Sequence, residues 1–312
     1  MIGDVEWEDH GLSMDIDKLP KDIHKLENLL RVPHDSKISL SKDYSTKLKV
    51  SGLSKKGAKA LLEEGIPVLA EYQSKLYAQN NYALLIVLQA LDAAGKDGTI
   101  KHVMSGMNPQ GCQVTSFKAP SSEDLDHDYL WRCFRKLPER GNIGIFNRSY
   151  YEEVLIARVH PKILDRQQLP DHLKDKNIWK RRFEEINNFE KYLVNNGIIV
   201  LKFFLNVSKG EQKERFLERL ELPEKNWKFS VSDATERSYW NDYTKAYEDC
   251  FNNTSTKWAP WYIIPADNKP FARVAVAYII GQKLKSLDLK YPTVTKAMKE
   301  ELQKAKAILK NE

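Results

Sequence analysis

The feature that most constrains the fold is an uninterrupted apolar run, Ala83–Leu88, with a Gly-Lys pair seven residues after it. A run of this length without a polar residue is typical of a strand buried on both faces, as in a parallel sheet covered by helices. It is far shorter than the roughly 20 apolar residues that cross a bilayer. The glycine of the pair opens a helix, predicted over residues 95–104. The chain therefore predicts a buried strand, a tight turn and a helix in succession.

Four more strand patterns alternate with helical patterns. The predicted strands are Gln113–Phe117, Asn142–Asn147, Ile198–Leu205 and Trp261–Ile264. The predicted helices run from a capping box at Ser121 through Phe134, from about Tyr150, and from roughly Asp175 to Val194. This alternation predicts an α/β fold, a parallel sheet of about five strands covered by helices on both faces. Ligands of such sheets bind beyond the carboxyl ends of the strands.

Composition and charge narrow the class of protein. The three cysteines (Cys112, Cys133 and Cys250) are far apart, and the N-terminus is acidic without an apolar core. We therefore expect a cytoplasmic protein with no secretory signal and no membrane partner. The net charge of +6 does not call for nucleic acid. Its lysines are concentrated in residues 36–60, which hold seven lysines and one acid, and this stretch is a candidate for meeting an anion.

The turn after the first strand resembles a phosphate loop. The pattern G-x-x-x-x-G-K-[ST], known as Walker A, is met at Gly95-Lys96 but missed at Ala90 and Asp97. Its physics survives, because small residues let backbone N–H groups turn inward and the helix N-terminus favours an anion. The alternative is an ordinary strand-to-helix turn. The predicted phosphate contacts here are Ala93, Ala94, Gly95, Lys96, Gly98, Thr99 and Lys101.

Asp92 is an acid inside this anion-binding loop. A carboxylate repels phosphate unless a cation lies between them, so Asp92 predicts Mg²⁺ bridging to phosphate oxygens. The alternative is that Asp92 only caps the following helix. Asp97 lies in the first helical turn, where the dipole favours an acid, and we expect a structural role for it.

Several separated motifs together resemble the polyphosphate kinase type 2 family. They are Leu88–Val103, Gly106–Gly111, Ser116–Pro120 and Phe146–Leu155, within a match from about Leu40 to Leu287. The resemblance implies a P-loop kinase-like fold with a lid, and Mg²⁺-dependent transfer between inorganic polyphosphate and nucleotides. The Asn-Arg-Ser-Tyr-Tyr-Glu-Glu-Val form is similar to the branch that acts on both AMP and ADP. Ala90 departs from the family's glycine, and we expect only a local adjustment of the turn.

Two residues at the end of the third predicted strand are further candidates. Arg148 can hold phosphate oxygens and offset charge during transfer, and the resemblance places the family's catalytic arginine there. Its alternative is an ion pair with Glu152 or Glu153, one turn on. Asn147 is neutral where P-loop enzymes commonly carry a metal-supporting Asp, so Asp92 would carry more of the metal binding.

A cationic helix and loop follow the fourth predicted strand. A capping box, Ser208–Glu211, starts a helix with Arg215 and Arg219 on one face, and Leu222-Pro223 ends it. This segment matches the family's lid, which a kinase needs to exclude water. The alternative is an exposed helix with its own ion pairs. The predicted polyphosphate contacts of the lid are Lys209, Arg215, Arg219, Lys225 and Lys228.

The predicted organisation has three parts: a helical, lysine-rich extension (1–80), the α/β domain (81–290) with a lid at about 206–235, and a charged helical tail (291–312). Nucleotide contacts are predicted at Lys118, Asp128, Arg132 and Asn147. The partners expected are polyphosphate and adenine nucleotides, with guanine left open, and a second copy of the chain. Two other functions stay open at this point, an ATP-dependent nucleoside-monophosphate kinase and a non-catalytic nucleotide-gated module.

Overall fold

One parallel sheet organises the molecule. The structure, a computed structural model, describes residues 25–47, 53–227 and 230–311. Five strands pair in the order β2-β3-β1-β4-β5, and every pairing is parallel. Their bounds are β1 (Ala83–Gln89), β2 (Cys112–Ser116), β3 (Ile143–Asn147), β4 (Ile198–Asn206) and β5 (Trp261–Pro265). The predicted α/β fold and its five strands are confirmed. The strand order reverses beside β1, which places a ligand site at its carboxyl end.

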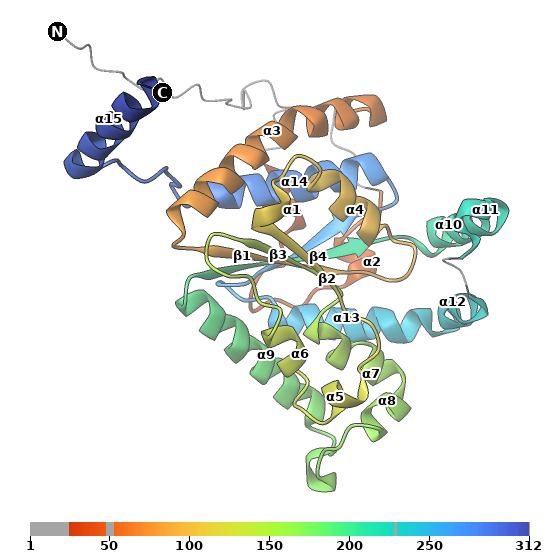
Figure 1. Cartoon of the computed structure of the whole chain (residues 1–312). Coiled ribbons are helices and arrows are strands. Elements are labelled where there is room, and N and C mark those ends of the chain that lie inside the picture. Colours follow the sequence, from red (N-terminus) through yellow and green to blue (C-terminus); the bar gives the residue numbers. More distant parts are fainter. Residues whose placement is uncertain (1–24, 48–52, 228–229, 312) are drawn as a thin grey trace.

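Helices cover both faces of the sheet, as Figure 1 shows. On one face lie α1 (Leu26–Leu30), α3 (Lys55–Gln79), α4 (Lys96–Val103) and α14 (Lys269–Lys285); on the other lie α9 (Ile178–Asn195) and α13 (Trp240–Thr254). Alternate residues of β1 serve the two cores. Leu84 and Ile86 pack toward α3 and α14, whereas Leu85 and Val87 pack toward α9 and α13. Burial on both faces explains why this strand carries no polar alternation.

The N-terminal helices are part of the packed body. Ser54 caps α3 by accepting a hydrogen bond from the Gly57 N–H, and α3 then runs through Pro67 without a break. It packs along α14, and Leu62, Leu69 and Leu76 belong to the same core as β1. The α3 helix therefore completes one covering layer of the sheet.

Two of the predicted helices are wrong in extent. The capping box at Ser121 exists, but its helix ends after one turn as α5 (Ser122–Leu125), and α6 (Trp131–Phe134) starts separately. Between them the Asp128 side chain accepts a hydrogen bond from the Leu130 N–H, a local turn that competes with the helix. The predicted helix from Tyr150 is instead a 3-10 turn, η4 (Tyr150–Val154), followed by α7 (Ile156–Val159).

The remaining short elements connect these layers. They are α2 (Leu40–Asp43), η3 (Pro109–Gly111), α8 (Pro161–Asp165), η5 (Asp171–Leu173) and η6 (Arg237–Tyr239). The lid segment comprises α10 (Lys209–Glu221), α11 (Pro223–Asn226) and α12 (Val231–Glu236), which project together at one end of the sheet in Figure 1. None of the helices that the structure describes is long and apolar enough to span a membrane.

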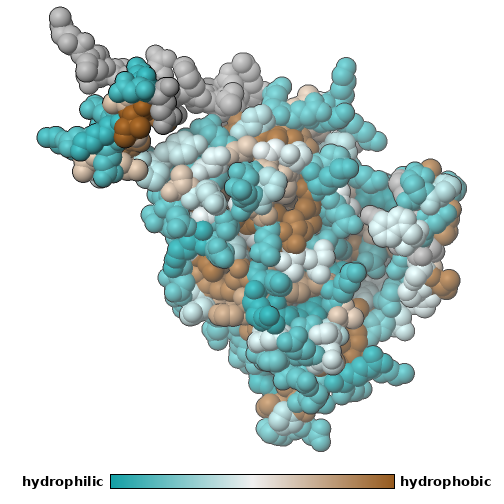
Figure 2. Space-filling view, in the orientation of Figure 1, coloured by the Kyte–Doolittle hydropathy of each residue, from teal (hydrophilic) through white to brown (hydrophobic). Residues whose placement is uncertain are grey.

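The last helix, α15 (Lys296–Lys310), stands apart from the body (Figure 1). None of its residues is buried, and Met298, Leu302, Ile308 and Leu309 are all largely exposed. Figure 2 shows brown, apolar side chains among teal, hydrophilic ones on this helix. It contributes nothing to the core that positions the site.

Candidate active site

The turn between β1 and α4 has the backbone shape of an anion-binding loop. Ala93 and Gly95 both have positive φ, +60° and +109°. Gly95 is the N-cap of α4 and makes no side-chain cap, so the first N–H groups of the helix face the loop without a side-chain acceptor from it. The Lys96 ammonium folds back over the turn and donates to the carbonyl oxygen of Ala90 at 2.8 Å. Small residues at 93–95 make this close turn feasible.

The charged form of Lys96 is disfavoured by its surroundings. Its pKa is lowered to about 8, chiefly by burial and then by the neighbouring Arg148 guanidinium, while Asp92 and Glu152 act in the opposite direction. An anionic ligand beside Lys96 would offset both the cost of holding its charge away from water and the repulsion by Arg148. The lysine is therefore poised to gain from binding phosphate.

Arg148 and Asp92 meet across the carboxyl ends of β3 and β1. The Arg148 Nη2 donates to Asp92 Oδ1 at 2.8 Å, and its Nη1 lies 3.8 Å from Glu152 Oε2. Arg148 has a φ of +66°, a backbone conformation that costs a non-glycine residue about 1–3 kcal/mol and persists only where its surroundings impose it. The predicted ion pair with Glu152 exists beside the Asp92 contact, whereas Glu153 pairs with Arg182. Asp92 does not cap α4.

Asp97 links the phosphate loop to β3. Asn147 donates its side-chain amide to Asp97 Oδ1 at 2.9 Å, and to Ser116 at the end of β2 at 3.5 Å. Asp97 also lies in the first turn of α4, as expected for an acid near a helix N-terminus. The predicted structural role of Asp97 agrees with these contacts, and Asn147 reaches the loop side of the site.

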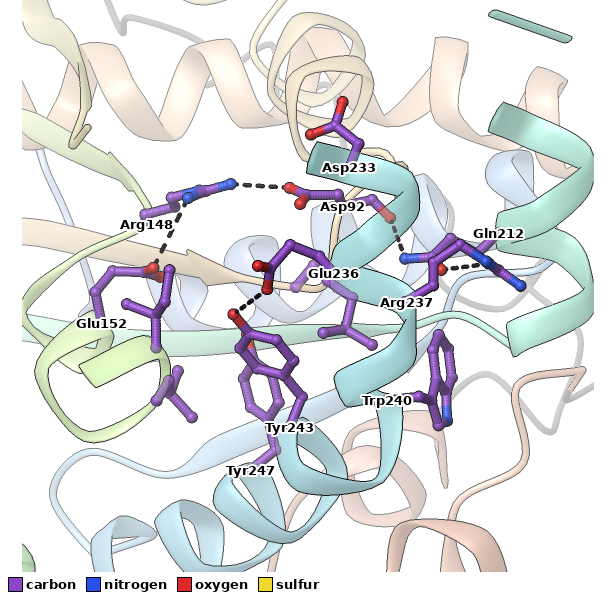
Figure 3. Close-up of a pocket in the computed structure, with 14 residues that line it drawn as sticks. Asp92, Arg148, Glu152, Gln212, Asp233, Glu236, Arg237, Trp240, Tyr243 and Tyr247 are labelled. Atoms are coloured by element: carbon purple, nitrogen blue, oxygen red, sulfur yellow. Dashed lines mark hydrogen bonds and ion pairs between the residues drawn. The ribbon is translucent and has the colours of Figure 1, made fainter. Parts of the chain in front are cut away.

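A pocket opens beside Asp92 and Arg148, and Figure 3 shows its lining. It encloses about 620 Å³ of space, part of it open to solvent. One wall comes from the lid and α13: Asp233, Glu236, Arg237, Trp240, Tyr243 and Tyr247. Sequence reasoning missed all of these residues. For three of them the signal was the spacing of 240, 243 and 247, which places three aromatic residues on one face of α13.

The lid is tied to the phosphate loop through Gln212. Its amide donates to the Asp92 carbonyl at 2.9 Å, and Arg237 donates to its side-chain oxygen at 2.5 Å (Figure 3). Arg237 also donates to the Lys209 carbonyl. Glu236 accepts from the Tyr243 hydroxyl at 2.9 Å and lies 3.0 Å from His160 Nε2. The lid therefore contacts the site through two sets of hydrogen bonds, one centred on Gln212 and the other on Glu236.

The structure does not support the predicted polyphosphate contact at Arg215. It is 5% exposed and does not present a free cation on the lid surface. Its donors form five hydrogen bonds, to Glu211 and to the carbonyl oxygens of Ala93, Ala94, Ala266 and Asp267. A guanidinium has five N–H donors, so Arg215 has none left for a phosphate in this conformation. It braces the loop, and Arg219, half-buried on the next turn, does not share this environment.

The start of α10 also differs from the predicted capping box. Ser208 accepts from the Glu211 N–H as predicted, but its own N–H donates to Asp267 rather than to Glu211. Glu211 is engaged by Arg215 instead. Lys209 is exposed at the helix start. Lys228 lies outside the described residues, and the Lys225 side chain is not described either.

Of the other predicted contact residues, some lie at the edge of the site and others only make local contacts within their own segment. Arg132 donates to the Lys118 carbonyl at 2.7 Å and lies over the Phe117 ring, close to the end of β2. Asp128 forms its own turn. Lys101 is exposed on α4, Gly98 faces Arg273, and the Thr99 N–H donates within the helix to Gly95.

The residues present can anchor one divalent cation only with help from a substrate. Asp92 uses one carboxylate oxygen for Arg148, and its other oxygen has no hydrogen-bond partner among the described residues. Within the same part of the chain, no group of three or more His, Cys, Asp or Glu residues is arranged to hold a metal. This fits Mg²⁺, which is commonly held by one or two carboxylates together with water and phosphate oxygens.

The central strand, glycine turn, strand order and facing cations define a P-loop kinase-like phosphotransferase. The chain matches the family described as Polyphosphate kinase 2 (PPK2) over residues 52–292 and belongs to that family. This confirms the resemblance found in its motifs.

Named relatives match most of the chain. It is 50% identical to an ADP-polyphosphate phosphotransferase of Rhodopseudomonas palustris, over 87% of this chain and 94% of that protein. It is 43% identical to an AMP/ADP-polyphosphate phosphotransferase of Meiothermus ruber, over 72% and 80%. The crystal structure of polyphosphate kinase 2 from Arthrobacter aurescens TC1 superposes with a TM-score of 0.80 at 41% identity, covering 89% of this chain and 95% of that chain.

Proposed function

We propose that this protein transfers phosphoryl groups reversibly between inorganic polyphosphate and adenine nucleotides, with AMP and ADP as acceptors that become ADP and ATP. The observation that carries the proposal is the Lys96 turn facing Arg148 across Asp92, in a chain of the polyphosphate kinase 2 family. The names of the relatives from Rhodopseudomonas palustris and Meiothermus ruber support these substrates. The assay below, run with GMP or GDP in place of the adenine nucleotide, tests guanine nucleotides as acceptors.

The chemistry follows from where the charges lie. Lys96 and the N–H groups at the start of α4 hold the transferring phosphate, and Arg148 offsets charge that develops on it. Transfer is direct and in line, because the protein holds donor and acceptor together rather than forming a covalent intermediate. The lid, held by Gln212 and Arg237, excludes water that would otherwise take the phosphoryl group.

Mg²⁺ is the metal we propose, held by Asp92 with phosphate oxygens of the substrate. When bound, it would supply positive charge that offsets the negative charge of the phosphate groups. Arg148 and Asp92 already contact each other, so Arg148 also fixes the orientation of the carboxylate that meets the metal. Asn147 fixes the first turn of α4 through Asp97.

Polyphosphate needs a row of cations, since it carries about one charge per phosphate. We propose a path over Lys96, Arg148 and the exposed Lys101 and Lys209, continued by Arg219, Lys225 and Lys228 of the lid. Lys118 and Arg132 lie at the end of β2 and are proposed for the nucleotide. We also propose a cytoplasmic location, where the free thiols of Cys112, Cys133 and Cys250 stay reduced, and a homo-oligomeric assembly.

The test separates this function from that of an ATP-dependent monophosphate kinase. The protein is incubated with Mg²⁺ and long-chain polyphosphate, with AMP or ADP and without ATP, and ADP and ATP are assayed. A parallel reaction supplies ATP and AMP without polyphosphate, and Lys96→Met is the matched negative control. Formation of ATP from ADP in the first reaction supports the proposal. Turnover only in the second reaction would overturn it.

A further inference from the structure

A closed polar network lies directly beneath the site, on the α9 and α13 face of the sheet. Lys202 of β4 and Glu190 of α9 are both 0% exposed, and their Nζ and Oε2 atoms are 2.6 Å apart. The Lys202 ammonium also donates to the Tyr151 hydroxyl at 2.8 Å and to the Thr254 carbonyl at 2.7 Å. All three donors of the ammonium are therefore used inside the protein.

Two consecutive tyrosines complete the network. The hydroxyls of Tyr150 and Tyr151 both donate to Glu190 Oε1, at 2.8 and 2.7 Å. Both tyrosines are buried, and both belong to η4, the turn that begins two residues after Arg148. The network therefore grips the segment that leads directly away from the site arginine.

Ser149 joins this segment to the phosphate loop strand. Its hydroxyl oxygen accepts from the Tyr151 N–H at 3.2 Å and from the Gln89 side-chain amide at 3.1 Å, and Gln89 is the last residue of β1. Residues 148–152 are thus held from below by the tyrosines and from the side by β1. Arg148, with its positive φ, projects from this segment toward Asp92, and Glu152 lies beside the Arg148 guanidinium.

Stability alone is a poor reason for such a network. A buried ion pair is often no more stable than well-packed apolar residues of the same volume, because desolvation offsets the attraction. The network instead fixes geometry. Two hydroxyls, two charged groups and one carbonyl can form all their hydrogen bonds in a single arrangement only. That arrangement sets the path of the chain that carries Arg148.

We propose that Glu190 and Lys202 are positioning residues for phosphoryl transfer, which act through the hydroxyls of Tyr150 and Tyr151 to aim Arg148 at the phosphate loop. The proposal rests on the role of Arg148 given above. It assigns a function in the reaction to four buried residues that contact no substrate.

The test uses Tyr150→Phe combined with Tyr151→Phe, which removes both hydroxyls and leaves the Glu190–Lys202 pair in place. Replacing either charged residue alone would leave a lone buried charge and endanger folding. The tyrosine variant is made in the wild type and in an Arg148→Lys background. For each protein, kcat and KM for polyphosphate and for ADP are measured per folded molecule, with the thermal midpoint.

Positioning predicts that the tyrosine variant lowers kcat by about 10-fold or more, since a misplacement of about 1 Å can cost about 100-fold. KM for ADP should change by less than about twofold. In the Arg148→Lys background the same change should lower kcat by less than about twofold, because residues that act as one unit are not additive.

Gln73→Leu is the matched control. Gln73 is a buried polar residue of α3 whose amide bonds to the backbone of Asn108, at the opposite edge of the sheet. It should lower the thermal midpoint and leave kcat per folded molecule unchanged.

Three outcomes would overturn the positioning role. An unchanged kcat in the tyrosine variant would do so, and so would equal losses in both backgrounds, which indicate a general structural effect. A normal kcat in Arg148→Lys alone would instead overturn the assigned role of Arg148, and the positioning proposal with it. A loss in Arg148→Lys without a loss in the tyrosine variant leaves the role of Arg148 intact.

Discussion

Two lysines on neighbouring strands have opposite roles. Lys96, which follows β1, is open to a ligand, whereas Lys202, within β4, is closed off by protein partners. Among the described residues, the Lys96 ammonium donates one hydrogen bond, to the Ala90 carbonyl, and faces the Arg148 guanidinium. The Lys202 ammonium donates three and is paired with Glu190. Burial lowers the pKa of both lysines.

The difference lies in the hydrogen-bonding capacity left over. Lys96 keeps two donors for a ligand and tolerates a repulsive neighbour, which only an anion can relieve. Lys202 keeps none, so its charge can serve geometry but not binding. A charged group with unused capacity marks the reaction site, and a fully satisfied one marks the support beneath it.

Lys202→Met should have the largest effect. It leaves Glu190 buried without its counter-charge, so we expect a loss of about 3–5 kcal/mol in the free energy of unfolding. Urea unfolding followed by far-UV circular dichroism measures it. The double variant Lys202→Met with Glu190→Leu, which removes both charges, should recover most of the loss. A single variant as stable as the wild type would show that the pair is not closed as described.

Lys96→Met should give the opposite result. Losing one preorganised charge contact should cost about 2–3 kcal/mol of transition-state stabilisation, a fall of about 100-fold in turnover. The free energy of unfolding should hold or rise, since a half-buried cation beside Arg148 has been removed. Turnover with saturating polyphosphate and ADP is measured beside unfolding in urea. Near-wild-type turnover would take Lys96 out of the mechanism.

Arg215 and Arg219 offer a comparison within one helix. Arg215→Met leaves the carbonyls of Ala93, Ala94 and Ala266 without their donor, so we expect about 2 kcal/mol lower stability together with lower turnover. Arg219→Met should chiefly weaken polyphosphate binding and make its salt dependence shallower, because fewer counterions are released. Thermal unfolding and polyphosphate titrations at two salt concentrations measure these effects. Equal behaviour of the two variants would contradict the assignment of Arg215 as a brace.

Asp92→Asn should raise the Mg²⁺ concentration needed for half-maximal activity by about 10-fold, since an amide is a weaker ligand for a hard cation. The Mg²⁺ dependence of turnover is measured at fixed polyphosphate and ADP. Asp97→Asn is the control, because Asp97 bonds Asn147 and is not proposed as a ligand. If the Mg²⁺ dependence of Asp92→Asn is that of the wild type, Asp92 does not hold the metal.

The smallest effect concerns pH. The pKa of Lys96 is lowered to about 8, chiefly by burial, so the free enzyme loses this cation as the pH rises through that value. We expect kcat/KM for polyphosphate to fall about threefold between about pH 7.5 and 8.5 as the protonated fraction declines. Lys96→Arg, which stays charged, should show a flatter profile over this range at a lower rate. A flat wild-type profile would contradict the lowered pKa.

The parts of the site that were predictable are those encoded locally. Lys96 and Gly95 follow a buried strand and open a helix, and Arg148 ends another strand, so adjacent residues already define their places. Both carboxyl-end positions then come together because parallel strands share one edge. The lid wall of the pocket was missed, although the spacing of Trp240, Tyr243 and Tyr247 already placed them on one helical face.

The roles of Arg215 and Lys202 could not be predicted from their neighbours in the sequence. In the sequence, Arg215 and Arg219 are equivalent cations four residues apart, and only packing against the 93–94 and 266–267 carbonyls makes one a brace. Lys202 interrupts an apolar strand without any nearby acid, and Glu190 reaches it from the preceding helix, α9.

The sequence by itself determined the alternation of strands and helices, the phosphate turn and the family. These depend on side-chain periodicity, backbone freedom at small residues and short motifs, all of which act between neighbours along the chain. Only the tertiary structure decided which charges remain open to a ligand and which are closed by partners. That choice depends on burial and on donors and acceptors brought from distant elements, because a charge taken from water must be satisfied by whatever the fold places beside it.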